Sequence, residues 1–347
     1  MKLPLLQKYL KVKGIDLAFL IHPDSNITYF TQMEPSFAFL LIYPQKAEFY
    51  LSLLDLPPKL SKIVIKRVKK GWENKLKDGK VKKVAINKET LTLAYLEKLK
   101  KIYPKASFED ISFLLKELRS KKTEEEVKKI SRACQITDKA FQSTLYQLER
   151  QALKTEKEVA SFIEKRFREL GAEPAFPTIA AMGSNGAIPH HLTSPQKLSK
   201  GFLLLDFGAR YKNYCADMSR VVYLGKPGAE EQSNYELLLN VQEQTIAQIK
   251  EKIPFSHLTD FAKEQLGRYS SYFIHSLGHG LGIEVHEAPS FSERKNKVQD
   301  GHVFTIEPGL YFPQKYGLRI EDTLLYYGKT KVLTKSPKEL IAIRPFS

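Results

Sequence analysis

The stretch FLLLDFGARYKNYCADMSRVVYLG, residues 202–225, consists of two apolar runs on either side of a polar turn, which predicts two antiparallel strands. The first run carries Asp206 and the second carries Asp217, at an odd separation centred on Tyr211 and Lys212. In a hairpin closed by two or four residues, these carboxylates would face each other and point to one side of the sheet. Adjacent carboxylates repel each other unless a cation lies between them. The hairpin is therefore either a metal site or an ordinary strand pair with surface acids.

Two further carboxylates lie among apolar neighbours. Glu307 ends the strand-like run of GHVFTIEPGLYF just before a Pro-Gly pair, and Glu321 lies within the strand-like run of GLRIEDTLLYY. A buried, unpaired carboxylate costs several kcal/mol, so each needs a partner. That partner is a base such as Arg319, or a metal ion.

The stretch HSLGHGLGIEVHEAP, residues 275–289, places three histidines among three glycines. It is either a solvated loop or part of a site. The four carboxylates, together with one imidazole from this loop, form an oxygen-rich set. Such a set suits two divalent ions and contains more carboxylates than structural zinc sites use. Two ions about 3.5–4 Å apart would activate water, so hydrolysis is the chemistry that this set favours.

Up to about residue 118, strand-like runs alternate with helical patterns, which predicts an α/β domain. We expect strands in DLAFLIH, FAFLLIYP, AEFYLS and KVAIN, and helices over 3–12, 55–78 and 89–101. A basic stretch at 119–122 and a capping-box pattern at Thr123 and Glu126 then predict a domain boundary and a new long helix. The pattern recurs at Thr155 and Glu158, opening a helix that ends near Gly171. Strands follow from residue 178, with helices at about 230–252 and 256–267, so this part is predicted to be α+β.

Composition excludes several classes of protein. The chain has 347 residues, 42% hydrophobic and 27% charged, which is typical of a globular protein of about two domains. No apolar run is long enough for a signal or membrane segment, so we expect a cytoplasmic protein without a membrane partner. The two cysteines, Cys134 and Cys215, are too few for a disulfide framework. The net charge is +16, but no nucleic-acid-binding motif accompanies it in the sequence. We therefore expect the lysines to be solvated and expect no nucleic-acid partner.

The Asp-x10-Asp pair, HSLGHGLGIEVHE, TIEPGLY and RIEDT, in this order, resemble motifs of the dinuclear metallopeptidases of the pita-bread fold. The resemblance is to the Xaa-Pro aminopeptidase and prolidase branch. LRSKKTEEEVKKISRACQITDKAF is similar to the opening helix of its catalytic domain. The resemblance implies an α/β, creatinase-type N-terminal domain over residues 1–118 and an α+β pita-bread catalytic domain over residues 119–347.

The resemblance also implies roles for individual residues. Asp206 would bind one metal, Asp217 and Glu321 would bridge both, and His279 with Glu307 would complete the second ion's shell. His275 and His286 would lie behind the ligands or contact substrate, with His286 on the scissile carbonyl. His190 would be a further histidine on the substrate side, with the adjacent His191 as an alternative. Arg319 would steady Glu321 or reach substrate. We expect the loop glycines to let the backbone approach the metals, and His22, His257 and His302 to play no part.

The activity that the resemblance implies is metal-dependent cleavage of the bond before a proline in second position, with Mn²⁺ as the expected metal and Co²⁺, Zn²⁺ or Fe²⁺ as alternatives. A homodimer is also implied. Relatives restricted to dipeptides often carry a basic residue just after the HE-x-P segment, where this chain has Ser290, with Arg294 further along. We therefore expect an Xaa-Pro aminopeptidase acting on longer peptides, with an Xaa-Pro dipeptidase (prolidase) as the alternative. Methionine aminopeptidase and a non-catalytic, basic binding module are further alternatives.

Overall fold

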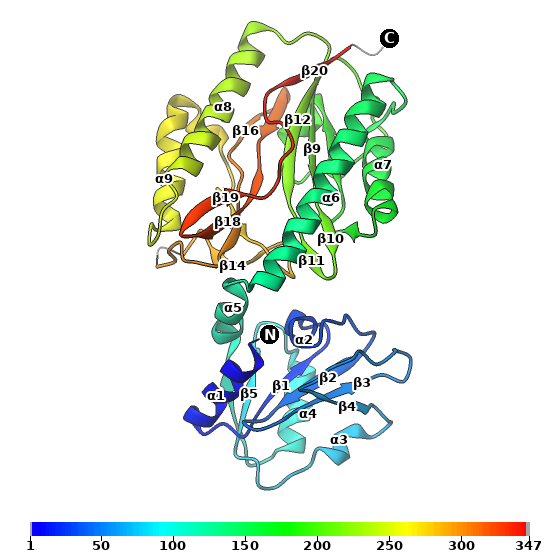
Figure 1. Cartoon of the computed structure of the whole chain (residues 1–347), viewed down its shortest axis with the longest axis vertical. Helices are drawn as coiled ribbons and strands as arrows, with labels where there is room; N and C mark the ends of the chain where they lie inside the picture. Colours follow the sequence, from blue (N-terminus) through cyan, green and yellow to red (C-terminus); the bar gives the residue numbers. More distant parts are fainter. Residues whose placement is uncertain (1, 294, 345–347) are drawn as a thin grey trace. The chain divides into compact units, whose positions relative to one another are not determined.

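The structure, a computed structural model, describes residues 2–293 and 295–344, with Lys75 described by its backbone alone. The chain divides into two compact units, Met1–Arg119 and Ser120–Ser347 (Figure 1). Each unit has its own sheets and its own apolar core, and each is described below by itself.

The first unit is an α/β structure around a mixed six-stranded sheet of order β4-β3-β2-β1-β5-β6. β1 pairs antiparallel with β2 and parallel with β5. The strands are β1 (Leu17–Ile21), β2 (Ala38–Ile42), β3 (Ala47–Leu51), β4 (Val64–Arg67), β5 (Lys83–Ile86) and β6 (Ser107–Asp110). The helices are α1 (Leu3–Lys13), α2 (Ser25–Thr31), α3 (Trp72–Lys75), α4 (Leu93–Ile102) and α5 (Ser112–Ser120).

Most of the elements predicted for this unit are confirmed, and one is wrong. The four predicted strands form β1, β2, β3 and β5, and the two outer predicted helices form α1 and α4. The helix predicted over 55–78 is replaced by a loop, β4 and the short α3. Pro57 and Pro58 disfavour a helix at its start, and Ile63 and Ile65 follow the two-residue period of a strand. Parallel pairing with β3 then stabilises this segment as the strand β4.

The described residues of the second unit form several sheets and four α-helices, as predicted for an α+β domain. A four-stranded sheet has the order β20-β12-β9-β8, and a five-stranded sheet has the order β14-β13-β15-β18-β19. The strands of the four-stranded sheet are β8 (Ile179–Met182), β9 (Gly201–Phe207), β12 (Met218–Leu224) and β20 (Ile341–Ile343). Those of the five-stranded sheet are β13 (His279–Gly280), β14 (Glu287–Ser290), β15 (Val303–Ile306), β18 (Asp322–Tyr327) and β19 (Lys329–Val332).

Smaller elements complete the second unit. A three-stranded sheet contains β7 (Glu173–Pro174), β10 (Ala209–Tyr211) and β11 (Tyr214–Cys215), and a hairpin pairs β16 (Gly309–Phe312) with β17 (Tyr316–Arg319). The helices are α6 (Glu124–Glu149), α7 (Glu156–Glu169), α8 (Ala229–Ala247) and α9 (Phe255–Leu266), with 3-10 turns η1 (Gly183–Ala187) and η2 (Gly267–Tyr272).

Strand β9 is covered on both faces because its apolar side chains alternate between two cores. Phe202 and Leu204 pack into the core that includes α8 and α9, whereas Leu203 and Leu205 pack into the core that includes α6 and α7. Successive side chains of a strand point to opposite faces, which explains the alternation. Figure 1 shows α6 and α7 on one side of these strands and α8 and α9 on the other. Asp206 therefore lies on the face of Phe202 and Leu204.

The helix starts predicted from capping patterns are confirmed. Thr123 and Glu126 form the reciprocal capping box of α6. Thr155 caps α7 through the N–H of Glu158, but the Glu158 carboxylate accepts from Lys154 instead of from the capping residue. Lys122, in the basic stretch expected at the boundary, is buried and forms an ion pair with Glu287 at 2.9 Å. Part of that stretch is therefore interior structure.

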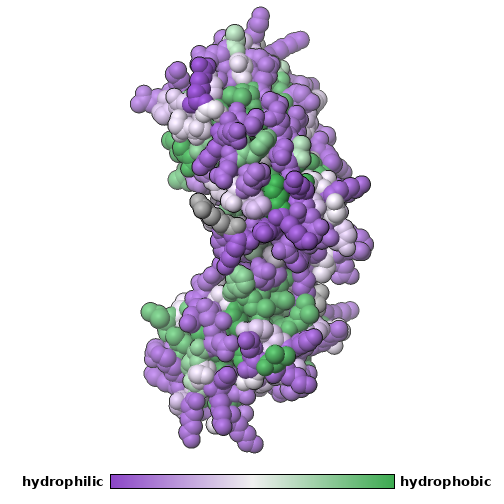
Figure 2. Space-filling model, turned by 90° about the vertical axis from the view of Figure 1, so that its left-hand side faces the viewer, coloured by the Kyte–Doolittle hydropathy of each residue, from purple (hydrophilic) through white to green (hydrophobic). Residues whose placement is uncertain are grey.

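Hydrophilic side chains cover most of the face shown in Figure 2, in keeping with the charged composition. None of the helices in the described part of the chain combines the length and the apolar composition needed to span a bilayer.

Candidate metal centre

The Asp206–Asp217 hairpin forms, but its register differs by two residues from the predicted one, and the centre of its turn lies one residue later. β9 and β12 pair antiparallel with Ser219 opposite Asp206, and β10 and β11 continue the ladder to a two-residue turn at Lys212 and Asn213. Both turn residues have positive φ, at 47° and 68°, as tight hairpin turns require. Asp217 lies two residues before Ser219, so the two carboxylates are diagonal neighbours on one face instead of directly opposite.

His279 and Glu307 reach the same place from the five-stranded sheet. His279 begins β13, and Glu307 follows the end of β15, as predicted. Nε2 of His279 lies 3.3 Å from Oε1 of Glu307 and 3.5 Å from Oδ2 of Asp217. The hydroxyl of Thr305 accepts from the His279 backbone N–H at 3.1 Å and contacts Oε1 of Glu307 at 3.3 Å. One threonine therefore contacts both residues.

The glycines of the histidine loop allow close packing of neighbouring backbones. A Cβ on Gly278 would lie 2.1 Å from the carbonyl oxygen of Thr305, and one on Gly280 would lie 2.3 Å from the carbonyl carbon of Ala288. Real Cβ atoms do not approach other atoms this closely. Contact between neighbouring β-segments is therefore one reason for these glycines, and the expected approach of the loop to the metals stays a prediction.

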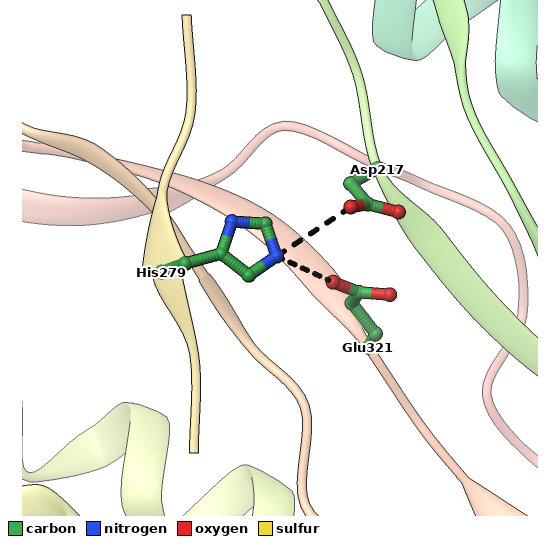
Figure 3. Close-up of side chains that lie close together, drawn as sticks. All are labelled: Asp217, His279 and Glu321. Atoms are coloured by element: carbon green, nitrogen blue, oxygen red, sulfur yellow. Dashed lines mark ion pairs between the residues drawn. The ribbon is translucent and has the colours of Figure 1, made fainter. Parts of the chain in front are cut away.

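Glu321 completes the group from the break between β17 and β18, where the predicted continuous strand is interrupted. Ligand atoms of Asp217, His279 and Glu321 all lie within 4.8 Å of one another. Figure 3 shows the three side chains converging from three separate segments. Oε1 of Glu321 is 4.0 Å from Nε2 of His279. Asp217 and Glu321, which are more than a hundred positions apart in the sequence, therefore lie at one site.

The donor set fits divalent cations. Among the described residues, one buried oxygen of each of Asp206, Asp217 and Glu321 accepts no hydrogen bond. Burial raises the pKa of Asp217 well above its usual value, and the nearby Glu321 and Asp206 carboxylates add to the rise. Burial is also the main cause of the raised pKa of Glu321, and it raises the pKa of Glu307 to about 8. Buried carboxylates left in this state need positive charge, which hard or borderline divalent ions supply.

The histidines of the loop are neutral. Burial, with a smaller contribution from the neighbouring His286, lowers the pKa of His279 to about 3. Nδ1 of His279 lies 3.2 Å from the carbonyl oxygen of Gly280, so this nitrogen is the one that donates. Nε2 is then left with a lone pair toward Asp217, Glu307 and Glu321, as a metal ligand requires. The ring of His286 lies edge-on to that of His279, with centroids 4.2 Å apart.

Arg319 connects the carboxylates instead of projecting from the site. Its guanidinium donates to Oδ2 of Asp206 at 2.6 Å and to the hydroxyl of Ser219 at 2.8 Å, which in turn donates to Oε2 of Glu321 at 2.8 Å. A third bond reaches the Tyr311 hydroxyl at 2.6 Å. Arg319 is buried, and these bonds occupy its fork. Its contact with Glu321 therefore passes through Ser219.

His275 lies at the far end of this network. Its Nδ1 is 2.8 Å from the carbonyl oxygen of Ser276, and its Nε2 is 2.9 Å from the Tyr311 hydroxyl. Burial lowers the pKa of His275 to about 4, and the charge of Arg319 contributes. Nδ1 is also 3.8 Å from Oε2 of Glu307. This histidine is therefore a neutral ring that neighbours Tyr311 and Glu307.

The adjacent histidines 190 and 191 separate into two environments. His191 lies 3.1 Å from the fully buried Glu156 carboxylate, which also accepts from the backbone N–H groups of Met182 and Ser194. His190 is exposed and close enough to the site for its charge to lower the pKa of His275 and of His286. Of these two histidines, His190 is therefore the one that is open to a ligand.

Sequence interpretation missed four residues that support the site: Ser219, Thr305, Tyr311 and Thr323. Ser219 and Thr305 each lie two residues from a carboxylate on a strand, on the same face, and this spacing was a usable signal. Thr323 exchanges two hydrogen bonds with the backbone of Asp217, at 2.7 and 3.2 Å. Tyr311 and Thr323 end the TIEPGLY and RIEDT motifs, but no role was assigned to either residue from the sequence. The three histidines that were set aside, at 22, 257 and 302, are absent from the described site contacts.

The family model of metallopeptidase family M24 matches residues 128–326, and the model of the creatinase/prolidase N-terminal domain matches residues 2–121. The chain belongs to metallopeptidase family M24. It is 34% identical to the Xaa-Pro dipeptidase of Pyrococcus furiosus over 355 residues, which cover 98% of this chain and 99% of that protein. The expected resemblance is confirmed, and this M24 chain is a metal-dependent peptidase.

Solved structures of M24 relatives share both units. The prolidase from Pyrococcus horikoshii OT3 aligns with a TM-score of 0.89 and 30% identity, covering 98% of this chain and 99% of that one. The X-Pro aminopeptidase from Thermotoga maritima aligns with a TM-score of 0.88 and 30% identity, covering 97% and 100%. The predicted creatinase-type N-terminal domain and pita-bread catalytic domain are therefore confirmed, and the non-catalytic alternative is not supported.

Proposed function

We propose that this M24 peptidase hydrolyses the Xaa-Pro bond of dipeptides, using two divalent ions held by Asp206, Asp217, His279, Glu307 and Glu321. The observation that carries the proposal is the convergence of buried carboxylate oxygens without hydrogen bonds on a neutral imidazole nitrogen. Cations stabilise the ionised form of such a cluster, and its ligand types match divalent ions.

The preference for dipeptides revises the expectation of an enzyme for longer peptides. The dipeptidase name of the Pyrococcus furiosus relative and the prolidase name of the Pyrococcus horikoshii structure favour the alternative, while the Thermotoga maritima structure supports the original expectation. A dipeptidase must recognise the free carboxylate of the proline. Arg319 is already committed to Asp206, Ser219 and Tyr311. Arg294, the other basic residue considered from the sequence, lies outside the described residues.

When bound, the two ions supply Lewis acidity that activates water and polarises the scissile carbonyl. Asp206, Asp217, Glu307 and Glu321 would hold the ions through carboxylate oxygens, and His279 would hold them through its Nε2. Arg319 would act as a positioning residue, because it fixes Asp206 directly and Glu321 through Ser219. The chain itself thereby supplies both the charge of the site and its rigidity.

Other residues of the site would act on the substrate. His286, next to His279 and half-buried, would donate a hydrogen bond to the carbonyl oxygen as negative charge develops there. Glu307 would pass a proton to the departing proline nitrogen, which suits a carboxyl group whose pKa burial has raised. The exposed His190 would contact the substrate from the loop before β9, and His275 would hold Tyr311 in place.

Manganese is the proposed metal, and Co²⁺, Zn²⁺ and Fe²⁺ are the ions against which it is to be compared, because ligand types alone do not rank them. A homodimer, suggested by the family resemblance, is proposed as the assembly. Metal analysis and sedimentation of the purified protein test these two points separately.

The experiment that tests the proposed activity compares kcat/KM for Ala-Pro and for Ala-Pro-Ala-Ala with Mn²⁺-loaded protein. We expect a preference of at least ~100-fold for the dipeptide, which corresponds to about 2.7 kcal/mol of transition-state stabilisation. Ala-Ala is the control for the requirement for proline. Equal values for the two proline peptides would instead identify an Xaa-Pro aminopeptidase. Cleavage of neither, with any of the four metals, would contradict both.

A further inference from the structure

The ligands of the proposed metal pair come from two different sheets. Asp217 immediately precedes β12 of the four-stranded sheet, and Glu321 immediately precedes β18 of the five-stranded sheet. The distance between their carboxylates therefore depends on how these sheets are held together. This dependence matters because two bridged ions need a separation of about 3.5–4 Å.

Arg220 ties the two sheets together behind the site. It follows Ser219 on β12, so its side chain leaves the opposite face of the strand from Ser219 and Asp217. The side chain is buried, and its guanidinium donates to the carbonyl oxygen of Glu321 and to Oδ1 of Asp322, the latter at 2.7 Å. Arg220 of the four-stranded sheet thus binds the backbone of the proposed ligand Glu321. It also binds the side chain of the next residue, Asp322, which begins β18 of the five-stranded sheet.

Asp322 receives more than this one bond. Its oxygens also accept from Thr334 at 2.8 Å and from Gln242 at 2.9 Å, and Lys338 lies 3.5 Å away. Donors therefore hold both oxygens of the carboxylate, Arg220 and Thr334 on Oδ1 and Gln242 on Oδ2, and fix its direction.

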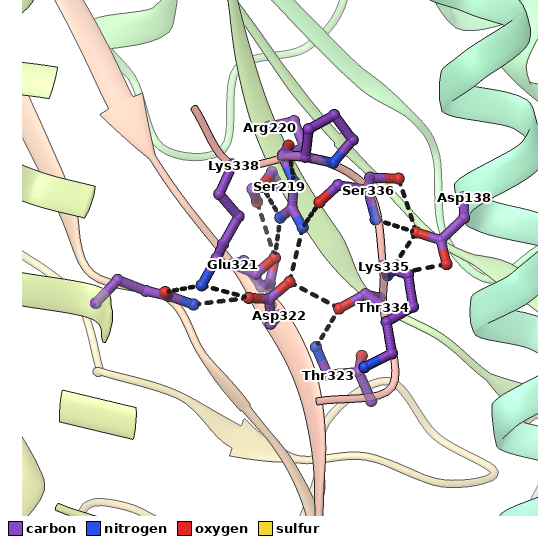
Figure 4. Close-up of polar contacts among 12 residues, drawn as sticks. Asp138, Ser219, Arg220, Glu321, Asp322, Thr323, Thr334, Lys335, Ser336 and Lys338 are labelled. Atoms are coloured by element: carbon purple, nitrogen blue, oxygen red, sulfur yellow. Dashed lines mark hydrogen bonds and ion pairs between the residues drawn. The ribbon is translucent and has the colours of Figure 1, made fainter. Parts of the chain in front are cut away.

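A short segment after β19 closes the network. Residues 334–338, here called the C-terminal strap, supply the Ser336 and Pro337 carbonyl oxygens, which accept from Arg220 at 2.9 and 3.0 Å. Asp138 on α6 holds the strap from its other side, accepting from the N–H groups of Lys335 and Ser336 at 2.9 and 2.8 Å. Figure 4 shows Arg220 and Asp322 between the strap and Glu321, with Asp138 on the far side of the strap.

We infer that Arg220 and Asp322 are positioning residues that set the separation of the Asp217 and Glu321 carboxylates, and so the affinity for the second metal ion. The inference rests on the proposed function, because it needs these two carboxylates to be ligands. Arg220 lies on the reverse face of β12, and none of the described contacts of Arg220 and Asp322 reaches the open ligand oxygens of Asp206, Asp217 or Glu321. Their effect is expected on metal binding first and on catalysis as a consequence.

The test measures Mn²⁺ binding to metal-free protein, with free Mn²⁺ followed by electron paramagnetic resonance. Asp322→Asn keeps the shape of the side chain and Arg220→Lys keeps the charge, but each loses part of the network. We expect the dissociation constant of the weaker ion to rise about 10–100-fold in both, as is typical when residues that support metal ligands are changed. The spectroscopic exchange coupling between two bound Mn²⁺ ions should weaken as well.

Asp138→Asn is the matched control. It removes a buried carboxylate with four bonds to the same strap but has no bond to the ligand-bearing segments among its described contacts. We expect lower thermal stability with unchanged Mn²⁺ affinity and coupling. If Asp322→Asn fails to fold, Gln242→Leu, which removes one of the bonds to Asp322, provides the milder variant, with a rise of a few-fold.

Two failures are distinguishable. Wild-type protein that binds neither Mn²⁺ nor Co²⁺ as a pair would contradict the proposed function itself. Wild-type protein that binds the pair, together with folded Asp322→Asn and Arg220→Lys proteins of unchanged affinity and coupling, would contradict only the positioning role. An equal loss of affinity in Asp138→Asn would also contradict it, because strap attachment alone would then explain the effect.

Discussion

His286 is the residue whose proposed role separates most clearly from metal binding. It contacts the ring of His279 but is not among the residues whose ligand atoms converge. We expect His286→Ala to keep its metal while kcat falls by a factor equivalent to about 2–4 kcal/mol, the usual effect of removing one donor to a developing oxyanion. Metal content and kcat are measured on the same sample, with the exposed His257 as the matched alanine control. A His286→Ala enzyme of normal kcat would remove this residue from the mechanism.

Burial of charged residues makes the stability of the metal-free protein depend on pH. Burial raises the pKa of Glu307 from its usual 4.5 to about 8, so the folded state holds a proton that the unfolded state releases. Its contribution to stability is present below pH 4.5 and is lost as the pH rises toward 8. The histidines act oppositely, because the pKa of His279 is lowered from 6.5 to about 3, but their effect is complete by about pH 6.5.

Between pH 6.5 and 8 only the Glu307 contribution to stability still changes, and it decreases. We therefore expect the denaturation midpoint of metal-free protein to fall as the pH rises across this window. Glu307→Gln should flatten the dependence, and Mn²⁺ should remove it, because bound cations favour the ionised carboxylates. A midpoint that rises with pH over this range would show that the carboxyl groups are already ionised without metal.

The role of a residue could be predicted from the sequence where it depends on neighbouring residues in the chain. Asp206, Asp217, Glu307 and Glu321 were selected as carboxylates at strand ends or among apolar neighbours, and the structure brings all four to one region. The route from Arg319 to Glu321 through Ser219 was not predictable, because it depends on contact between residues one hundred positions apart.

At the scale of elements, β13 and β15 meet so closely that glycine is required between them. A Cβ on Gly278 would collide with the backbone of Thr305, which cannot move without shifting β15. We expect Gly278→Ala to lower the free energy of unfolding by about 1–3 kcal/mol and to weaken metal binding, since His279 and Glu307 lie on these two segments. Gly79→Ala, with no atom within 4 Å of the added Cβ, is the control. An unchanged unfolding curve for Gly278→Ala would refute the steric argument.

Element boundaries followed the sequence where local rules and pairing agreed. α6 began at its capping box, whereas the region 55–78 became strand and short helix because pairing with β3 outweighed an apparent helical spacing. The hairpin turn moved by one residue to Lys212 and Asn213, because a two-residue turn with positive φ fits the twist of the strands. Such outcomes depend on the partner strand, which a single segment does not reveal.

At the scale of the whole molecule, the metal pair should contribute both activity and stability. Chelation followed by dialysis should abolish cleavage of Ala-Pro and lower the melting temperature, and added Mn²⁺ should restore both, because a ligand bound only by the folded state stabilises it. The melting temperature should rise with Mn²⁺ concentration. Full turnover in excess chelator would contradict the assignment of this chain's activity to its metal site.

The position of the C-terminal strap has a consequence for the order of events on the ribosome. Residues 334–338 are translated after every proposed ligand, from Asp206 to Glu321. On the inference drawn above, a nascent chain that has already exposed all five ligands contains Arg220 and Asp322 but lacks the strap residues that hold these two side chains in place. Tight loading of the second ion then waits until the strap has left the exit tunnel and docked. The cell would therefore supply metal to released chains, and partly synthesised ones would remain poor competitors for it.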